Sequence, residues 1–156
     1  MKGIQMIDRR TMIGIMLAAI PAAACSKAQK PAPLVQVYKS PACGCCGAWV
    51  ESLRASGFKT ITQDMDDVSP IAAAAGVPDN LRSCHTALVE GYFVEGHVPD
   101  GDIRKLLRER PDARGIAVPG MPVGSPGMEQ GGRQEPYSTL IVARDGSVRS
   151  FVDHAI

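Results

Sequence analysis

The stretch LVQVYKSPACGCCGAWVESLRA (residues 34–55) carries the strongest signals for fold and chemistry. Residues 34–38 alternate apolar and polar side chains, a pattern that predicts a strand. Residues 48–55 predict a helix that ends at Gly57. The connection holds three closely spaced thiols: Cys43, Cys45 and Cys46. The dipole and free N–H groups of a helix N-terminus favour thiolate, which is a nucleophile and a ligand for soft metals.

Length and composition are those of a single domain. The chain has 156 residues, enough for one domain and a targeting segment but not for two full domains. Aromatic residues make up 4% of it, so we expect an aliphatic core. Beyond residue 24 it carries 14 basic (Lys and Arg) and 15 acidic (Asp and Glu) residues. This near-neutral balance does not support nucleic-acid binding.

Residues 1–24 have the features of an export signal peptide. A basic region that includes Arg9-Arg10 precedes an apolar run over residues 12–20, and residues 21–24 form a small-residue cleavage site. The apolar run is too short for an ordinary membrane span. The sequence around the two arginines resembles a twin-arginine signal, and both the twin-arginine and the Sec route stay open. We therefore expect an exported, periplasmic protein.

Cys25 directly follows the cleavage site. The tetrapeptide Ala22-Ala23-Ala24-Cys25 resembles a bacterial lipobox, in which a lipid on the cysteine anchors the mature protein to a membrane. The usual Leu at the position of Ala22 is missing, so a spare cysteine beside an ordinary cleavage site is the alternative. Residues 25–33, rich in Lys, Ala and Pro, predict a tether, and residues 34–156 are expected to form the domain.

Export to an oxidising compartment raises the question of how the other four cysteines pair. Adjacent Cys45 and Cys46 make a poor disulfide, and Cys43 with Cys45 would close a strained ring. Cys43 and Cys46 are the easy pair, as in redox C-x-x-C motifs, which leaves Cys45 and Cys84 to pair or to bind something. A structural zinc site is the alternative. It usually takes two C-x₂₋₄-C or H-x₃₋₅-H pairs, and the sequence has no second such pair.

The rest of the domain predicts further strands and helices. Five strands are expected, at residues 58–63, 87–89, 92–95, 139–142 and 147–151. Two more helices are expected, one at residues 71–75 and one that starts at Asp100 and stops at Arg110-Pro111. The order of strand, thiol loop, helix, strand, helix, hairpin and helix resembles the thioredoxin fold. We therefore expect an α/β protein with a mixed sheet flanked by helices, followed by a loop and a C-terminal hairpin.

In the thioredoxin fold the loop that enters the first hairpin strand faces the redox motif and usually carries a cis-proline. Here Ser83-Cys84-His85-Thr86 occupies that place, without a proline. The resemblance implies that Cys84 and His85 lie against the three thiols of the first loop, which makes His85 a candidate ligand. We interpret His97, at the end of the hairpin, as a loop histidine and leave its ligation open, and we assign no role to His154.

The segment VPGMPVGSPGM (residues 118–128) is a Pro- and Gly-rich loop with two methionines, Met121 and Met128. Thioether sulfur is a soft ligand suited to Cu(I). One interpretation is a lid that presents both methionines to the thiol site. The other is a turn-rich loop whose methionines fill gaps. The Gly-rich residues 129–136 that follow are expected to be mobile.

Several motifs together resemble the CopG-like family. They are Tyr38-Lys39-Ser40-Pro41, Cys43-Gly44-Cys45-Cys46, Ser83-Cys84-His85-Thr86, Gly96-His97-Val98-Pro99 and the loop from Met121 to Met128. The resemblance covers residues 35–151. Members are exported bacterial metal-binding proteins, many known only as a domain of unknown function and often encoded with copper-resistance genes. The resemblance implies a thioredoxin-like domain that binds copper through clustered cysteines, with a role in interconverting Cu(I) and Cu(II).

The leading functional hypothesis is copper binding for tolerance outside the cytoplasm. The expected ligands are Cys43, Cys45, Cys46, Cys84, His85, Met121 and Met128. The crowding of thiols predicts bridging thiolates and a cluster of more than one copper. The expected partners are copper ions and other copper-resistance proteins, with no nucleic acid, and with a membrane only through a lipid on Cys25.

Two other functions are retained. The first is a thiol–disulfide oxidoreductase that acts through Cys43 and Cys46 on protein substrates. The second is a passive carrier that hands copper to a partner. Under the leading hypothesis the same two cysteines, Cys43 and Cys46, are the redox-active residues, since forming a disulfide supplies electrons. Whether the protein is an enzyme therefore stays open.

Overall fold

The computed structural model describes residues 31–155. The expected signal peptide, Cys25 and most of the expected tether lie outside the described residues. Within residues 31–155, no helix is long and apolar enough to cross a membrane.

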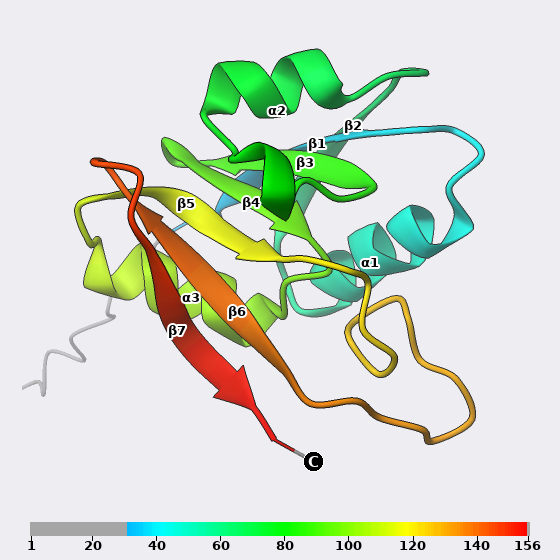
Figure 1. Ribbon diagram of the computed structural model, residues 1–156. Coiled ribbons are helices and arrows are strands. Elements are labelled where there is room, and N and C mark those ends of the chain that lie inside the picture. Colours follow the sequence, from blue (N-terminus) through cyan, green and yellow to red (C-terminus); the bar gives the residue numbers. More distant parts are fainter. Residues whose placement is uncertain (1–30, 156) are drawn as a thin grey trace, which may run out of the picture. The chain divides into compact units, whose positions relative to one another are not determined.

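The described chain forms an α/β fold with one mixed sheet (Figure 1). The strands are β1 (Leu34–Lys39), β2 (Lys59–Asp64), β3 (His85–Val89), β4 (Tyr92–Gly96), β5 (Ala113–Val118), β6 (Tyr137–Ala143) and β7 (Val148–His154). The helices are α1 (Gly44–Ala55), α2 (Ser69–Ala75) and α3 (Asp100–Glu109), with a 3-10 turn at Asp79–Leu81. The predicted class, a mixed sheet flanked by helices, is confirmed.

The strand order across the sheet is β2-β1-β3-β4-β5-β6-β7. β1 pairs in parallel with β2, and β4 pairs in parallel with β5, while the other neighbours are antiparallel. The first four strands and three helices follow the expected order along the chain. The predicted closing hairpin is present as β6 and β7, which are longer than expected.

Within the described residues, β5 is the strand that the sequence did not predict. Its residues, ARGIAV, lack a clean alternation because Gly115 interrupts them. The structure gives a reason for this glycine. A Cβ at Gly115 would overlap the carbonyl oxygen and the ring of Phe93 on β4. The close approach of the two strands therefore requires glycine.

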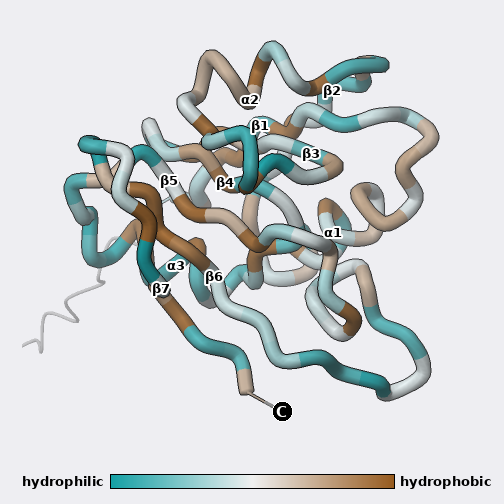
Figure 2. The backbone as a smooth tube through the Cα atoms, in the orientation of Figure 1, coloured by the Kyte–Doolittle hydropathy of each residue, from teal (hydrophilic) through white to brown (hydrophobic). Residues whose placement is uncertain are grey.

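The sheet is covered on both faces, and the two cores can be followed along the central strand β4. Val94 packs with side chains of α1 and α3, including Trp49 and Leu106. Its neighbour Phe93 points to the other face and packs with Ala72 of α2. All five residues of β4 are buried, as expected for a strand covered on both sides. Figure 2 shows the apolar colour concentrated along the central strands and the polar colour along the later part of the β5–β6 connection.

Candidate metal centre

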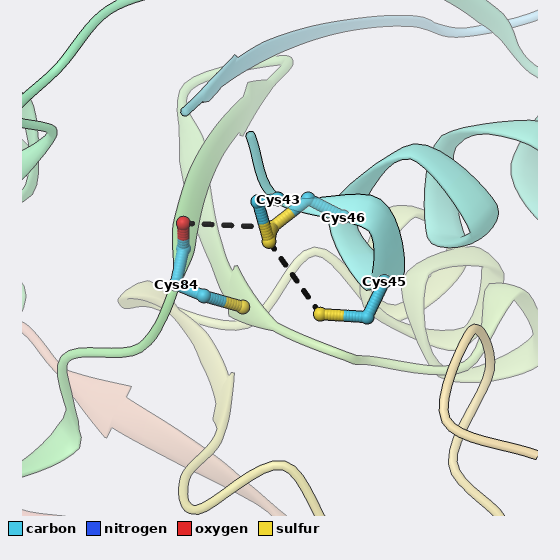
Figure 3. A group of neighbouring side chains, drawn as sticks. All are labelled: Cys43, Cys45, Cys46 and Cys84. Carbon is cyan, nitrogen blue, oxygen red and sulfur yellow. Dashed lines mark hydrogen bonds between the residues drawn. A yellow bond between two sulfur atoms is a disulfide. The ribbon is translucent and has the colours of Figure 1, made fainter. Parts of the chain in front are cut away.

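The pairing of β1 with β3 brings the two cysteine-containing segments together. In this antiparallel pair Lys39, at the end of β1, lies opposite His85, at the start of β3. Cys84 precedes His85 and therefore lies where the chain leaves β1 and enters the thiol loop. Figure 3 shows Cys84 facing the three cysteines at the start of α1. The four sulfur atoms lie within 4.8 Å of one another, as the resemblance to the thioredoxin fold implied.

Helix α1 begins earlier than predicted, so two of its thiols lie in its first turn. The sequence predicted a start at Ala48, but the helix starts at Gly44 with Cys43 as the N-cap. The N–H of Gly47 donates to the carbonyl of Cys43 at 3.2 Å, which closes the first helical turn. Cys43 and Cys46 are joined by a disulfide across this turn, with their Cα atoms 5.3 Å apart. This is the pair that the sequence favoured.

Cys45 and Cys84 are the unpaired cysteines of the described chain. The Cys45 sulfur lies 3.4 Å from that of Cys43, and because Cys43 is in the disulfide, Cys45 is the donor. Burial, with a smaller contribution from nearby Cys45, raises the pKa of the Cys84 thiol to about 11. Cys84 is therefore a protonated thiol at neutral pH, and a metal ion would have to displace this proton in order to bind.

Cys84 also belongs to a second group of donor atoms, with two histidines. Its sulfur lies 3.3 Å from Nε2 of His97 and 3.4 Å from Nδ1 of His85. Both imidazoles are fully buried, and all three donor atoms lie within 4.8 Å of one another. His97 does lie in the bend that follows β4, as we interpreted it, but we did not predict that its ring is buried beside Cys84. The signal was the Gly96-His97-Val98-Pro99 motif, which we used only for the resemblance.

The protonation of His97 follows from its partners. Nδ1 lies 2.8 Å from the carbonyl oxygen of Pro126, and since a carbonyl only accepts, Nδ1 carries the proton. Burial lowers the pKa of His97, although the Pro126 carbonyl opposes this shift. In the neutral ring the lone pair is on Nε2 and faces the Cys84 thiol. An imidazole oriented in this way by a carbonyl is typical of metal ligands.

His85 is held by a tilted aromatic contact with Trp49 rather than by a second hydrogen bond. The ring centroids of His85 and Trp49 are 4.4 Å apart and the ring planes are inclined by 40°, and Nε2 of His85 has no hydrogen-bond partner within the described chain. Burial first, and the neighbouring His97 second, lower the pKa of His85 to about 3. A neutral, buried imidazole with an unsatisfied nitrogen is uncommon in a purely structural role and fits a metal site.

Two further residues hold this arrangement, and the sequence did not reveal either role. The indole N–H of Trp49 donates to the carbonyl of Val98 at 2.9 Å, which fixes the backbone next to His97. The fully buried Glu95 accepts the N–H of Ser83 at 2.7 Å, which fixes the backbone next to Cys84. Burial raises the pKa of this carboxyl.

The two candidate methionines and His154 lie on later parts of the chain. Met121 is 41% exposed and Met128 is half-buried, both in the connection between β5 and β6. His154 lies on β7, where its Nε2 is 2.8 Å from a carboxylate oxygen of Asp102 on α3. The structure therefore brings together the four cysteines, His85 and His97, and separates His154 from them.

Comparisons with known proteins agree with the resemblance seen in the sequence. The family described as a protein of unknown function, DUF411, matches residues 81–128. Two solved structures titled copper resistance protein copG, forms 2 and 1, align with TM-scores of 0.76 and 0.75. They are 45% and 46% identical to this chain, and the alignments cover 80% of it and 99% and 98% of theirs. None of the curated proteins matches by sequence. At this identity and coverage, the chain belongs to the CopG family.

Proposed function

We propose that this protein binds Cu(I) through its clustered cysteines and handles copper outside the cytoplasm. The observation that supports this most directly is the meeting of four cysteine sulfurs, from segments 38 residues apart, within 4.8 Å. Thiolate is a soft ligand that selects Cu(I). The names of the solved relatives, copper resistance proteins, point to the same metal.

More than one copper is proposed because Cys84 belongs to two groups of donor atoms. The first group contains only sulfur, from Cys84 and the three cysteines at the start of α1. The second consists of the Cys84 sulfur and two imidazoles, those of His85 and His97. A thiolate shared by two groups can bridge two metal ions. The sulfur-only group favours Cu(I), whereas imidazole also suits Cu(II). A mixed set of this kind supports a role in interconverting the two oxidation states.

Formation of the Cys43–Cys46 disulfide provides the electrons for that role. When these two thiolates form the disulfide, they release two electrons, which reduce two Cu(II) ions to two Cu(I) ions. The oxidised protein then retains Cys45, Cys84, His85 and His97 as donors. A reductant of the thiol class must restore the two thiolates before the next cycle.

Thiol–disulfide exchange is the second candidate function, and the same disulfide favours it. Cys45 lies 3.4 Å from the Cys43 sulfur, so its thiolate can attack that sulfur, form a Cys43–Cys45 disulfide and release Cys46 as a thiolate. Because the Cys43–Cys45 ring is strained, attack by Cys46 readily restores the original disulfide. This internal reaction competes with attack by an outside substrate. A passive copper carrier is the third candidate. It differs from the redox function in that bound copper does not turn over electrons with a reductant or oxidant.

Export to the periplasm remains part of the proposal. It rests on the predicted signal peptide at residues 1–24 and on the disulfide, which persists in oxidising compartments. The mass of the mature N-terminus tests both the export route and the anchor. A diacylglyceryl mass on Cys25 supports a lipoprotein, and an unmodified N-terminus near this position supports release.

The deciding experiment measures copper and free thiols per chain. The protein from residue 25 onward is reduced without oxygen, loaded with Cu(I) and freed of unbound metal. We expect several coppers per chain and no reactive thiols among the four clustered cysteines. Retention of no copper, together with ready formation of the Cys43–Cys46 disulfide in air, would contradict the copper function and favour thiol–disulfide exchange.

A pair of variants makes this experiment specific to the cluster. Cys45→Ser and Cys25→Ser exchange the same atom, one inside the cluster and one outside the described residues. We expect Cys45→Ser to lower the copper number while leaving the circular dichroism spectrum unchanged, and Cys25→Ser to leave both unchanged. An unaltered copper number in Cys45→Ser would count against a shared thiolate cluster.

A further inference from the structure

We infer that residues 122–128, here called the cover segment, close over the thiol site and control how fast metal ions and thiol reagents reach it. Where it concerns metal, this inference rests on the proposed function. The cover segment belongs to the connection between β5 and β6, drawn from yellow to orange next to α1 in Figure 1. Its internal bonds, its contacts with the site and its outer support each bear on this role.

The cover segment is a compact unit with its own hydrogen bonds. The carbonyl of Pro122 accepts both the N–H and the hydroxyl of Ser125, at 3.1 and 2.7 Å. Met128 donates its N–H to the Ser125 carbonyl at 2.8 Å and accepts that of Gly124 at 3.0 Å. Ser125 is fully buried although it lies in a loop. A segment bonded in this way moves as one body rather than residue by residue.

Two neighbouring residues of the cover segment contact the site. The Pro126 carbonyl accepts the Nδ1 proton of His97 at 2.8 Å. Gly127 lies against the first turns of α1, and a Cβ at this position would be 2.7 Å from the Cys45 carbonyl oxygen and 2.8 Å from the Trp49 nitrogen. These are backbone atoms of a helix, which cannot move aside. Closure therefore requires glycine at residue 127.

The outer support of the cover segment consists of surface contacts. Glu129 accepts the N–H of Gly127 at 2.9 Å, in an exposed bond. Glu135 accepts the N–H of Val123 at 3.2 Å through its side chain and donates its own N–H to the Val123 carbonyl at 2.9 Å. These bonds compete with water, so they resist opening less than the buried contacts do.

His97 connects the cover segment to the metal centre, since one ring nitrogen faces Cys84 and the other binds Pro126. When the segment lifts, His97 loses the acceptor that orients its ring, and the backbone around Cys45 becomes exposed. Pro126 is therefore a positioning residue for His97, whereas Gly127 only provides the clearance that lets the segment close against α1. Closure slows metal exchange by holding His97 in place and by shielding the two unpaired thiols.

The test compares Gly127→Ala with Gly132→Ala. Both glycines have a left-handed backbone, with φ of +84° and +80°, so alanine brings the same conformational strain. A Cβ meets α1 at residue 127 and nothing within 4 Å at residue 132. The first readout is the rate at which iodoacetamide alkylates Cys45 and Cys84 in the metal-free, oxidised protein. The second is the rate at which a Cu(I) chelator removes copper from the loaded protein.

We expect Gly127→Ala to raise both rates at least about tenfold. This corresponds to a loss of about 1.4 kcal/mol in the free energy that favours the closed segment over the open one. The copper number should stay the same, and Gly132→Ala should behave like the unchanged protein. Rates in Gly127→Ala that match those in Gly132→Ala would overturn the inference. A lower copper number at saturation would overturn it as well, because the segment would then build the site rather than cover it.

Two features keep the test decisive. If the unchanged protein binds no copper, the proposed function fails, but the alkylation rates still decide whether the segment covers the thiols. If Gly127→Ala does not fold, Glu129→Ala removes the acceptor of the Gly127 N–H without adding an atom near α1. Glu129→Ala should also raise both the alkylation rate and the copper-removal rate. Unchanged rates in this variant would contradict the inference.

Discussion

Trp49→Phe tests how far the metal centre depends on the residues around it. Trp49 is the one tryptophan of the chain and is fully buried. Its ring contacts that of His85 at a tilt, and its indole N–H donates to the Val98 carbonyl, next to His97. Phenylalanine keeps an aromatic ring but has no donor. The substitution therefore leaves the buried Val98 carbonyl without a partner and reduces the area of aromatic contact with His85.

The expected loss of stability has two parts. An unsatisfied buried carbonyl costs about 1–3 kcal/mol. The smaller ring leaves a cavity of roughly 40 Å³, which costs about 1 kcal/mol at about 24 cal/mol per Å³. Together these give about 2–4 kcal/mol. For a domain of this size the melting temperature of the metal-free protein should fall by roughly 6–20 °C.

The same substitution should weaken copper binding. Replacing a residue that orients a metal ligand typically costs about 10–100-fold in affinity, and Trp49 orients both His85 and the backbone next to His97. Competition against a Cu(I) chelator measures this loss. Tyr92→Phe is the matched control, since the buried Tyr92 likewise donates to one carbonyl, that of Pro111, at 2.9 Å. It should lower the melting temperature without changing copper affinity.

Either of two results would refute this reasoning. If Trp49→Phe lowered copper affinity no more than Tyr92→Phe, the indole would be a stability residue only. If its melting temperature fell by less than about 2 °C, the Val98 carbonyl would have found another partner, and the magnitude derived from an unsatisfied buried group would be wrong.

Two further predictions concern the methionines and the closing hairpin. Replacing Met121 and Met128 together by Leu is expected to weaken Cu(I) retention, because thioether is a soft ligand, and unaltered competition against a chelator would assign both to packing. Hydroxyls of Ser138 and Ser150 donate to Asp153 and hold the pKa of its carboxyl below the usual 3.8. This contribution to stability is present above pH 3.8 and lost as the pH falls through the lowered pKa. The melting temperature of Asp153→Asn should therefore lie below that of the unchanged protein at pH 6 and converge with it in strong acid, and a constant difference would contradict the assignment.

Local sequence determined most of the secondary structure. Alternating side chains in β1, the Glu90-Gly91 turn between the apolar runs of β3 and β4, and the glycine after α1 predicted their elements because such signals act over a few residues. The Cys43–Cys46 pair was also readable from spacing alone, since three residues on one helical turn bring two thiols within reach. β5 was missed because Gly115 interrupts its pattern. The close approach of β4 requires this glycine, and no signal within the segment itself shows that.

The composition of the site was decided by tertiary structure. The register of β1 against β3 places Cys84 beside the thiol loop, and no local pattern records a register between strands 46 residues apart. His97 looked like a loop residue because it follows the last residue of a strand. It is buried because Trp49 fixes its neighbour Val98 and Pro126 fixes its ring. The sequence by itself determined which donor atoms the chain carries and where the helix presents three of them. Only the fold decided which distant side chains meet them, because that depends on long-range packing of the sheet and of the cover segment.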